Sequence, residues 1–159
     1  MEESPVVIRY AETDDDVIAI HQFLLVVARP AMLCPVNPAK SLLEIIRVTK
    51  EEVALMAIKD GHLVGTLGLI RPVWWYGDEA FLTDRWHFVL PAFHHGEPDK
   101  ALKAEARKIA DDTGLKFIDQ GKIRPQKDGT FLLMPRIYSS ESATLQPQGD
   151  PDVLRQHHH

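Results

Sequence analysis

The stretch from Val89 to Leu102, which reads VLPAFHHGEPDKAL, decides how the whole sequence is interpreted. It runs from an apolar, strand-like segment through a polar turn into the beginning of a helix, with Pro98 where helices commonly start. The turn holds two histidines, one glycine and two acidic residues. Backbone N–H groups that converge at a helix N-terminus can bind an anion. Two alternatives therefore arise for this turn: a phosphate-binding site, or simply the start of a helix.

The composition is typical of one ordinary domain that buries its own core. The chain has 159 residues, of which 45% are hydrophobic and 26% are charged. Its formal net charge of −5 argues against a broad electrostatic contact with nucleic acid. Cys34 is the only cysteine, which excludes an internal disulfide, and no apolar run approaches about 18 residues. We therefore expect a cytoplasmic protein that binds neither nucleic acid nor membrane.

We expect a single domain over residues 1–140 and a polar tail over residues 141–159. The tail is poor in apolar residues and offers little to pack against a core. Its last three residues are histidines that look like the remnant of a purification tag, so they are excluded from the search for a site.

The N-terminal part predicts a strand and two helices that cover one face of a sheet. Residues 5–11 form a β-rich run, and Thr13 can cap a helix whose first turn carries three aspartates. This helix should continue to about Arg29, because Pro30 ends it. A second, shorter helix follows a connection broken by prolines. The apolar positions that define the two helices are Val17, Ile20, Leu24 and Val27 in the first, and Leu42, Leu43 and Ile46 in the second.

The middle of the chain predicts an antiparallel meander. Residues 53–58 and 62–70 are strand-like runs, and Asp60-Gly61 between them is a strong signal for a tight hairpin turn with positive φ at both positions. A third strand over about residues 80–90 should follow, and Pro91 closes it.

A helix, a parallel strand and an edge strand should complete the fold. The helix starts near Pro98 and stops at Gly114. The strand over residues 115–118 should lie parallel to the last strand of the meander through a right-handed crossover. A strand over residues 130–138 should lie at a sheet edge, because Pro135 cannot donate to a ladder. The predicted fold class is α/β (α+β): a mixed, largely antiparallel six- to seven-stranded sheet with helices on both faces.

This order of elements resembles the GNAT superfamily of acetyl-CoA-dependent N-acetyltransferases. The opening IRYAETD over residues 8–14 is similar to the family's first strand and helix entry, and the overall pattern is similar to small GNAT-like proteins encoded by bacteriophages. The resemblance implies transfer of an acetyl group from acetyl-CoA, as co-substrate, to an amine of a small molecule or protein. The residues that carry it after the meander are VLP over 89–91, then Leu102, Ala106, Ala110 and the pair Gly114-Leu115.

The resemblance also implies that the turn after the third meander strand binds the pyrophosphate of coenzyme A. In the family this turn has a proline, two residues, an arginine or glutamine, and then alternating glycines. His94 stands at the arginine or glutamine position here, while His95, Glu97 and Asp99 stand at the glycine positions and Gly96 is one place off. The length of the turn is kept and its chemistry is changed.

Some charged residues in this turn oppose the binding of a pyrophosphate and others favour it. Glu97 and Asp99 place negative charge near a bound pyrophosphate, and Pro98 removes one N–H donor. The histidines and Lys100 supply positive charge. A weakened coenzyme site and a turn that only begins a helix both stay open. The candidate coenzyme-binding residues are Val89, Leu90, His94, His95, Gly96 and Lys100.

Acetyl transfer to an amine needs a group that accepts the amine proton and a group that polarises the thioester carbonyl. By resemblance, backbone N–H groups near Val89 and Leu90 would polarise the carbonyl. Side chains alternate along a strand, so Asp84 and His87 lie on opposite faces of the third meander strand. We prefer Asp84 or Glu79 to His87 as the general base.

The leaving thiolate in this family is often protonated by a tyrosine on a helix after the fifth strand. Residues 119–129 are rich in Gly, Pro and charge and should not form that helix. Tyr138 is the C-terminal substitute, and a half-buried tyrosine on an edge strand is the alternative.

The aromatic run Trp74-Trp75-Tyr76 has two interpretations. Trp74 and Trp75 could form a substrate-binding platform or a surface that docks a protein. Alternatively, Trp74 packs on the sheet while Trp75 points outward. The histidines have no carboxylate–histidine spacing of a metal site, so we expect no bound metal.

Two functions follow from these observations. The first is an N-acetyltransferase with the turn around the coenzyme pyrophosphate, either alone or as a homodimer. The second is a catalytically inactive GNAT-like binding module, for example a phage protein that contacts a host protein through the aromatic run. Binding of acetyl-CoA separates them, because a ligand that binds only the folded state raises its stability.

Overall fold

The structure is a computed structural model that describes residues 4–93, 96–119, 123–125, 131–133 and 136–139. The chain divides into two compact units. The first contains Met1–Ile70 and Arg85–Ala106, and the second contains Arg71–Asp84 and Arg107–His159. The polar tail predicted for residues 141–159 lies outside the described residues.

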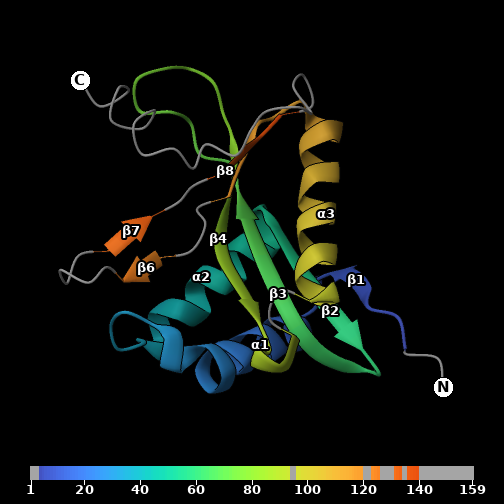
Figure 1. Cartoon of the computed structure of the whole chain (residues 1–159). Coiled ribbons are helices and arrows are strands. Elements are labelled where there is room, and N and C mark those ends of the chain that lie inside the picture. The colour runs from blue at the N-terminus through green and yellow to red at the C-terminus, as the bar shows by residue number, and fades with distance from the viewer. Residues whose placement is uncertain (1–3, 94–95, 120–122, 126–130, 134–135, 140–159) are drawn as a thin grey trace. The chain divides into compact units, whose positions relative to one another are not determined.

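The strands form a mixed sheet of six in the order β1-β2-β3-β4-β5-β8, and a separate pair, β6-β7 (Figure 1). The pairs β1–β2, β2–β3 and β5–β8 are antiparallel, whereas β4 and β5 are parallel, as the crossover rule predicted. The mixed, largely antiparallel sheet is therefore confirmed. The strands are β1 (Val7–Tyr10), β2 (Val53–Lys59), β3 (His62–Ile70), β4 (Leu82–Val89), β5 (Phe117–Asp119), β6 (Ile123–Pro125), β7 (Phe131–Leu133) and β8 (Arg136–Tyr138).

The first helix, α1 (Asp14–Phe23), begins where the sequence predicted. Thr13 is its N-cap: its hydroxyl accepts from the N–H of Asp16, and the Asp16 carboxylate accepts from the N–H of Thr13, which completes a capping box. The same carboxylate binds the guanidinium of Arg9 on β1 through both oxygens, at 2.8 and 2.9 Å. The capping box thus also joins the helix start to β1, and the Arg9 guanidinium holds the pKa of Asp16 well below its usual range.

The helical backbone does not stop at Arg29. A π-helical turn, η1 (Leu24–Ala28), follows α1, and a 3₁₀ turn, η2 (Arg29–Ala31), carries the helical path past Pro30. A proline is tolerated there because it stands near the start of a new short turn. The wider π turn keeps Leu24 and Ala28 on the buried side, whereas Val27, which the 3.6-residue period placed there, is only half-buried.

The second helix, α2 (Pro38–Glu51), has 14 residues, which makes it longer than α1 alone but shorter than the continuous helical path of α1, η1 and η2, as predicted. Asn37 caps it by accepting from the N–H of Lys40. The buried side consists of Ile45 and Val48, while Leu43 is 67% exposed, so the placement of Leu43 in the core was wrong. Since α1 and α2 contact each other, part of each helix face is covered by the other helix rather than by the sheet.

The hairpin of β2 and β3 turns at Asp60-Gly61, as predicted. Both residues have positive φ, 53° and 75°, and Lys59 pairs with His62 across the turn. The hairpin has small residues where neighbouring elements pack closely against it. Gly65 pairs with Ala57 and Gly68 pairs with Ala54.

The two glycines of β3 lie on opposite faces of the sheet and leave room for different neighbours. A Cβ atom at Gly65 would come within 3.2 Å of Leu102 on α3 (Glu97–Thr113), and a Cβ atom at Gly68 would come within 2.5 Å of the Trp86 ring on β4. The Trp86 indole N–H donates to the hydroxyl of Thr66, which donates to the carbonyl of Leu55, both on buried residues. This chain of hydrogen bonds fixes the ring over Gly68.

The second unit corrects the prediction of one strand over residues 130–138. The structure has two strands there, β7 and β8, of which β7 pairs with β6 and β8 pairs with β5. Residues 119–129, where the sequence predicted no helix, contain strand β6. Pro135 lies outside the described residues. The edge position of the last strand is confirmed, because β8 ends the strand order.

Candidate active site

The turn between β4 and α3 keeps a compact backbone. A 3₁₀ turn, η3 (Pro91–Phe93), follows β4, and α3 begins at Glu97. The N–H of Gly96 donates to the carbonyl of Phe93 at 2.8 Å, and a Cβ atom at Gly96 would lie only 3.0 Å from that oxygen. The glycine that stands one place off the family pattern is therefore used to close the turn. His94 and His95 lie outside the described residues.

Both acidic side chains of the first turn of α3 are engaged by protein groups. The carboxylate of Glu97 accepts from the N–H of Val6, at 3.4 Å. The carboxylate of Asp99 lies 2.8 Å from Nε2 of His87 on β4 and 3.4 Å from Nζ of Lys103. Nε2 of His87 makes no well-aligned hydrogen bond, so its contact with Asp99 is an ion pair when the imidazole is protonated.

The environment of Asp99 balances its charge. Proximity to His87, and secondarily to Lys103, holds the pKa of the Asp99 carboxyl well below its usual range. His87 is thereby placed on the α3 face of β4, opposite to the face of Trp86, which agrees with the predicted alternation. The negative charge of Asp99 at this turn is thus partly offset by Lys103, and by His87 when its imidazole is protonated, whereas the partner of Glu97 is a neutral backbone N–H.

Positive charge beside the turn comes from two lysines in the described residues. Lys100 is exposed in the first turns of α3. Lys59, at the end of β2, places its Nζ 5.3 Å from the ring centroid of Phe93. Sequence reasoning missed Lys59, because it stands 34 positions before Phe93 (93 minus 59) and has no local signal.

The backbone at the end of β4 offers one N–H to a ligand. The N–H of Leu90 donates to the carbonyl of Val64 on β3, at 2.9 Å. Successive N–H groups of a strand point to opposite edges, so the N–H of Val89 points to the edge away from β3. Of the two predicted amides, Val89 is therefore the better candidate for polarising a carbonyl.

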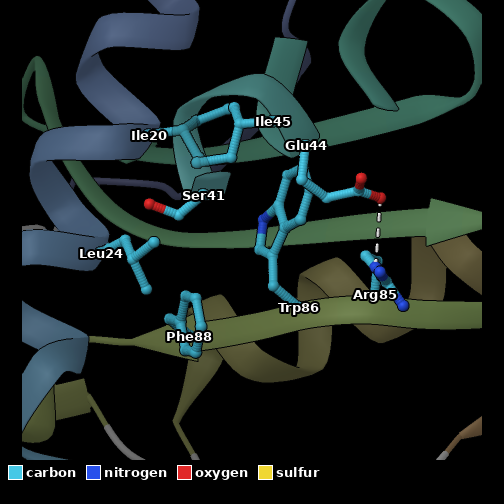
Figure 2. A pocket seen from close by; sticks show the side chains of 8 residues that line it. All are labelled: Ile20, Leu24, Ser41, Glu44, Ile45, Arg85, Trp86 and Phe88. Carbon is cyan, nitrogen blue, oxygen red and sulfur yellow. Dashed lines mark hydrogen bonds and ion pairs between the residues drawn. The ribbon is translucent and has the colours of Figure 1, made fainter. Parts of the chain in front are cut away.

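A cavity of about 170 Å³ lies in the first unit between α1, η1, α2 and β4. Figure 2 shows Leu24 and Phe88 at one end, the Trp86 ring in the middle, and Glu44 with Arg85 at the other end. Sequence analysis did not find this cavity, because it is formed by three segments that are distant along the chain. Its lining residues are Ile20, Leu24, Ser41, Glu44, Ile45, Arg85, Trp86 and Phe88.

The polar groups of the cavity all have protein partners. Nε2 of the buried His21 lies 3.1 Å from the Ser41 hydroxyl, which donates to the carbonyl of Pro38 at 3.1 Å. The Glu44 carboxylate accepts from Arg47 at 2.6 Å and from Nε of Arg85 at 3.2 Å. These arginines, Arg47 foremost, lower the pKa of Glu44, which therefore stays charged.

The predicted catalytic residues Glu79, Asp84 and Tyr138 all belong to the second unit. Glu79 is exposed just before β4, and Asp84 is half-buried on it. The Tyr138 hydroxyl donates to the Asp111 carboxylate at 3.0 Å, which raises the pKa of the tyrosine. The roles of these three residues stay predictions.

The aromatic run has Trp74 directed inward and Trp75 directed outward, and its role as a platform or docking surface stays a prediction. Trp74 is half-buried and stacks on Phe81 with ring centroids 3.9 Å apart. Trp75 is 92% exposed and meets Tyr76 edge to face. Trp75, Tyr76 and Val73 therefore form an exposed apolar surface in the second unit.

The described residues show neither a metal-binding cluster nor a membrane-spanning helix. They contain no group of three or more His, Cys, Asp or Glu side chains arranged to hold a metal ion. None of their helices has the length and apolar character needed to span a bilayer.

Comparison with known proteins identifies the fold. No protein-family profile matches the chain, and no curated protein matches it in sequence. A GNAT family acetyltransferase from Brucella melitensis, solved in complex with acetyl-CoA, is similar with a TM-score of 0.64 and 20% identity, over 91% of this chain and 93% of that chain.

Two further structures are similar over much of their length. A ribosomal-protein-alanine N-acetyltransferase from Brucella melitensis biovar Abortus 2308 has a TM-score of 0.59 at 17% identity, over 78% of this chain and 84% of that chain. AAC(6')-Iy, bound to the bisubstrate analog CoA-S-monomethyl-acetylneamine, has a TM-score of 0.58 at 17% identity, over 79% of this chain and 84% of that chain. The chain therefore has the GNAT fold, as its resemblance implied.

Proposed function

We propose that the protein is an N-acetyltransferase that uses acetyl-CoA to acetylate an amine of a small molecule or protein. The observation that carries this proposal is the first turn of α3, where both Glu97 and Asp99 are engaged by protein groups. A pyrophosphate at this helix start would meet the positive end of the helix dipole with less opposition than the sequence indicates. The fold supports the same function, because acetyl-CoA is bound by the similar Brucella melitensis enzyme.

The residues of the turn have separate tasks in this proposal. Gly96 allows the backbone to close tightly, and Lys59 and Lys100 supply cations for phosphate groups. The N–H of Val89 would donate to the thioester carbonyl oxygen, where negative charge develops. His94 and His95 are further candidates for phosphate contacts.

When acetyl-CoA is bound, it supplies an acetyl thioester: the amine nitrogen forms a bond to the carbonyl carbon, the carbon–sulfur bond breaks, and coenzyme A leaves as a thiolate that is then protonated. The amine must lose one proton, for which we propose Asp84 or Glu79, directly or through water. Tyr138 is the proposed acid for the thiolate. A tyrosine phenol is protonated at neutral pH in any case, and the hydrogen bond to Asp111, which raises the pKa of Tyr138, makes its proton harder to give up.

Binding of acetyl-CoA tests the proposal directly. Thermal unfolding and calorimetry should show that acetyl-CoA binds and stabilises the protein. Gly96→Ala should weaken this binding, because the new Cβ atom would lie only 3.0 Å from the Phe93 carbonyl oxygen. Gly77→Ala is the matched control, since a Cβ atom there has no neighbour within 4 Å. Absence of any shift at millimolar acetyl-CoA would refute the transferase.

The exposed aromatic surface favours a second candidate, a GNAT-like binding module without catalysis. Trp75 and Tyr76, with Val73, present rings and an apolar side chain to solvent, and such residues dominate protein interfaces. This candidate predicts no response to acetyl-CoA. It also predicts that Trp75→Ala removes binding to a protein partner while the thermal stability of the chain is unchanged.

A further inference from the structure

The cavity between α1, η1, α2 and β4 has a mostly hydrocarbon wall. Its volume of about 170 Å³ is close to that of engineered protein cavities of about 150 Å³ that hold a benzene molecule. A ligand inside it can therefore fill the space with one ring or a short branched chain. The apolar residues that form the wall are Ile20, Leu24, Ile45, Trp86 and Phe88.

The charged groups of the cavity favour a ligand without a second positive charge. Glu44 is the one carboxylate on the described wall, and it already accepts from Arg47 and Arg85. A second ammonium group on a ligand would compete with the arginines for Glu44, and it would face the like charge of Arg85. A polycationic amine is thus disfavoured, although AAC(6')-Iy, with the same fold, is bound to an analog built on neamine.

The position of the cavity suits an amine acceptor. Phe88 and Leu24 form one end, and Phe88 precedes Val89, the residue whose N–H is the candidate for the thioester carbonyl. Pro91, where the coenzyme turn begins, follows Phe88 by three residues, or roughly 10 Å of extended chain. The Ser41 hydroxyl, which donates to Pro38, keeps acceptor capacity for an amine N–H.

We propose that this cavity is the acceptor site and that it selects a primary amine carried on a compact apolar body, either a branched alkyl chain or a single aromatic ring. The inference rests on the proposed transferase function. The amine lies toward Phe88, and the apolar body lies against Trp86 and Ile45. Because Asp84 is four residues before Phe88 on β4, roughly 13 Å of extended chain, the amine proton would reach it through water rather than directly. Glu44 and Arg85 close the far end as a mutually neutralised pair.

Acetylation of an amine panel tests this specificity. The full chain is incubated with acetyl-CoA and either isopentylamine, phenethylamine, spermidine or kanamycin, and thiol release and acetylated products are measured. We expect kcat/KM for the first two amines to exceed that for the last two by at least about tenfold, the discrimination that pocket contacts of this size can supply. A preference for spermidine or kanamycin would overturn the inference.

Matched variants of the η1 turn test whether the cavity holds the acceptor amine. Leu24→Trp places a large ring in the cavity, and Val26→Trp places the same ring on the same turn at a position that is 71% exposed. Turnover of phenethylamine should be lost in the first variant and kept in the second, while both retain the thermal shift with acetyl-CoA. Equal turnover in the two variants would place the acceptor elsewhere.

A second variant covers the case in which Leu24→Trp does not fold. Leu24→Ala enlarges the cavity and should shift preference from isopentylamine toward the bulkier tryptamine by about tenfold. An unchanged ratio contradicts the inference. Failure of the transferase itself gives a different result: no thermal shift with acetyl-CoA and no thiol release with any amine.

Discussion

Replacing Gly68 with alanine should destabilise the protein by about 2–4 kcal/mol. The new Cβ atom would lie 2.5 Å from Cδ2 of Trp86 and 2.6 Å from two further ring atoms, so the indole must move. Forcing an extra methyl into a packed core costs about 1–3 kcal/mol, and loss of the buried Trp86–Thr66 hydrogen bond adds about 1 kcal/mol. Far-UV circular dichroism during urea unfolding measures the change without depending on tryptophan fluorescence.

A double-mutant cycle separates this clash from other effects of the substitution. In a Trp86→Leu background the ring is absent, so Gly68→Ala should cost less by about 0.5–3 kcal/mol, the range found for residues in contact. Gly77→Ala is the control and should change stability by less than about 1 kcal/mol, since its Cβ atom has no neighbour. An equal cost of Gly68→Ala in both backgrounds would refute the packing argument.

Three further predictions concern charged residues. Asp16→Asn should lower the free energy of unfolding by about 1–2 kcal/mol at neutral pH, because the half-exposed Arg9 limits what the ion pair contributes. Since the pKa of Asp16 is lowered in the folded state, this stabilisation is present above the ordinary carboxyl pKa of about 3.9 and is lost as the pH falls below it. Urea unfolding at a series of pH values should therefore show a smaller loss of stability in acid for the variant, and an equal loss would contradict the assignment. Lys59→Ala should raise the Kd for acetyl-CoA by about two- to tenfold and weaken its salt dependence in calorimetry, whereas an unchanged Kd would place the phosphates elsewhere. Arg85→Gln should raise the kcat/KM for spermidine relative to isopentylamine in competition assays, because Glu44 then holds one arginine fewer, and an unchanged ratio would mean that this pair does not set specificity.

The features that could be predicted from the sequence are those with local causes. Asp60-Gly61 requires a turn through its own backbone angles, and Thr13 caps α1 through groups three residues away. The parallel pairing of β4 with β5 followed from the handedness of crossovers, a rule that needs only the order of elements.

The features that could not be predicted depend on contacts between distant segments. Leu43 and Ile45 are both apolar on α2, and the packing of α2 against α1, β2 and β3 decides which of them is buried. The π turn at Leu24–Ala28 changes the helical period, and no residue type in that segment predicts it. Lys59 and the cavity above Trp86 likewise arise from long-range placement.

The single strand predicted over residues 130–138 failed for a related reason. A β-rich run does not reveal where a chain leaves one partner strand for another, and here β7 and β8 pair with different strands. The sequence likewise shows the negative charges in the first turn of α3 but not the groups that contact them. Their partners, His87 and Val6, come from β4 and from the chain just before β1.

The two glycines of β3 have an evolutionary consequence. At Gly68 an added carbon would collide with the Trp86 ring at 2.5 Å, whereas at Gly65 it would lie 3.2 Å from Leu102, so that neighbouring groups would have to shift slightly. Descendants of this sequence can drift widely elsewhere and still keep the spaced pair G-x-x-G in the second arm of the hairpin. That short signature, accompanied by alanines at the facing positions 54 and 57, should be a more durable marker for finding distant kin than overall identity.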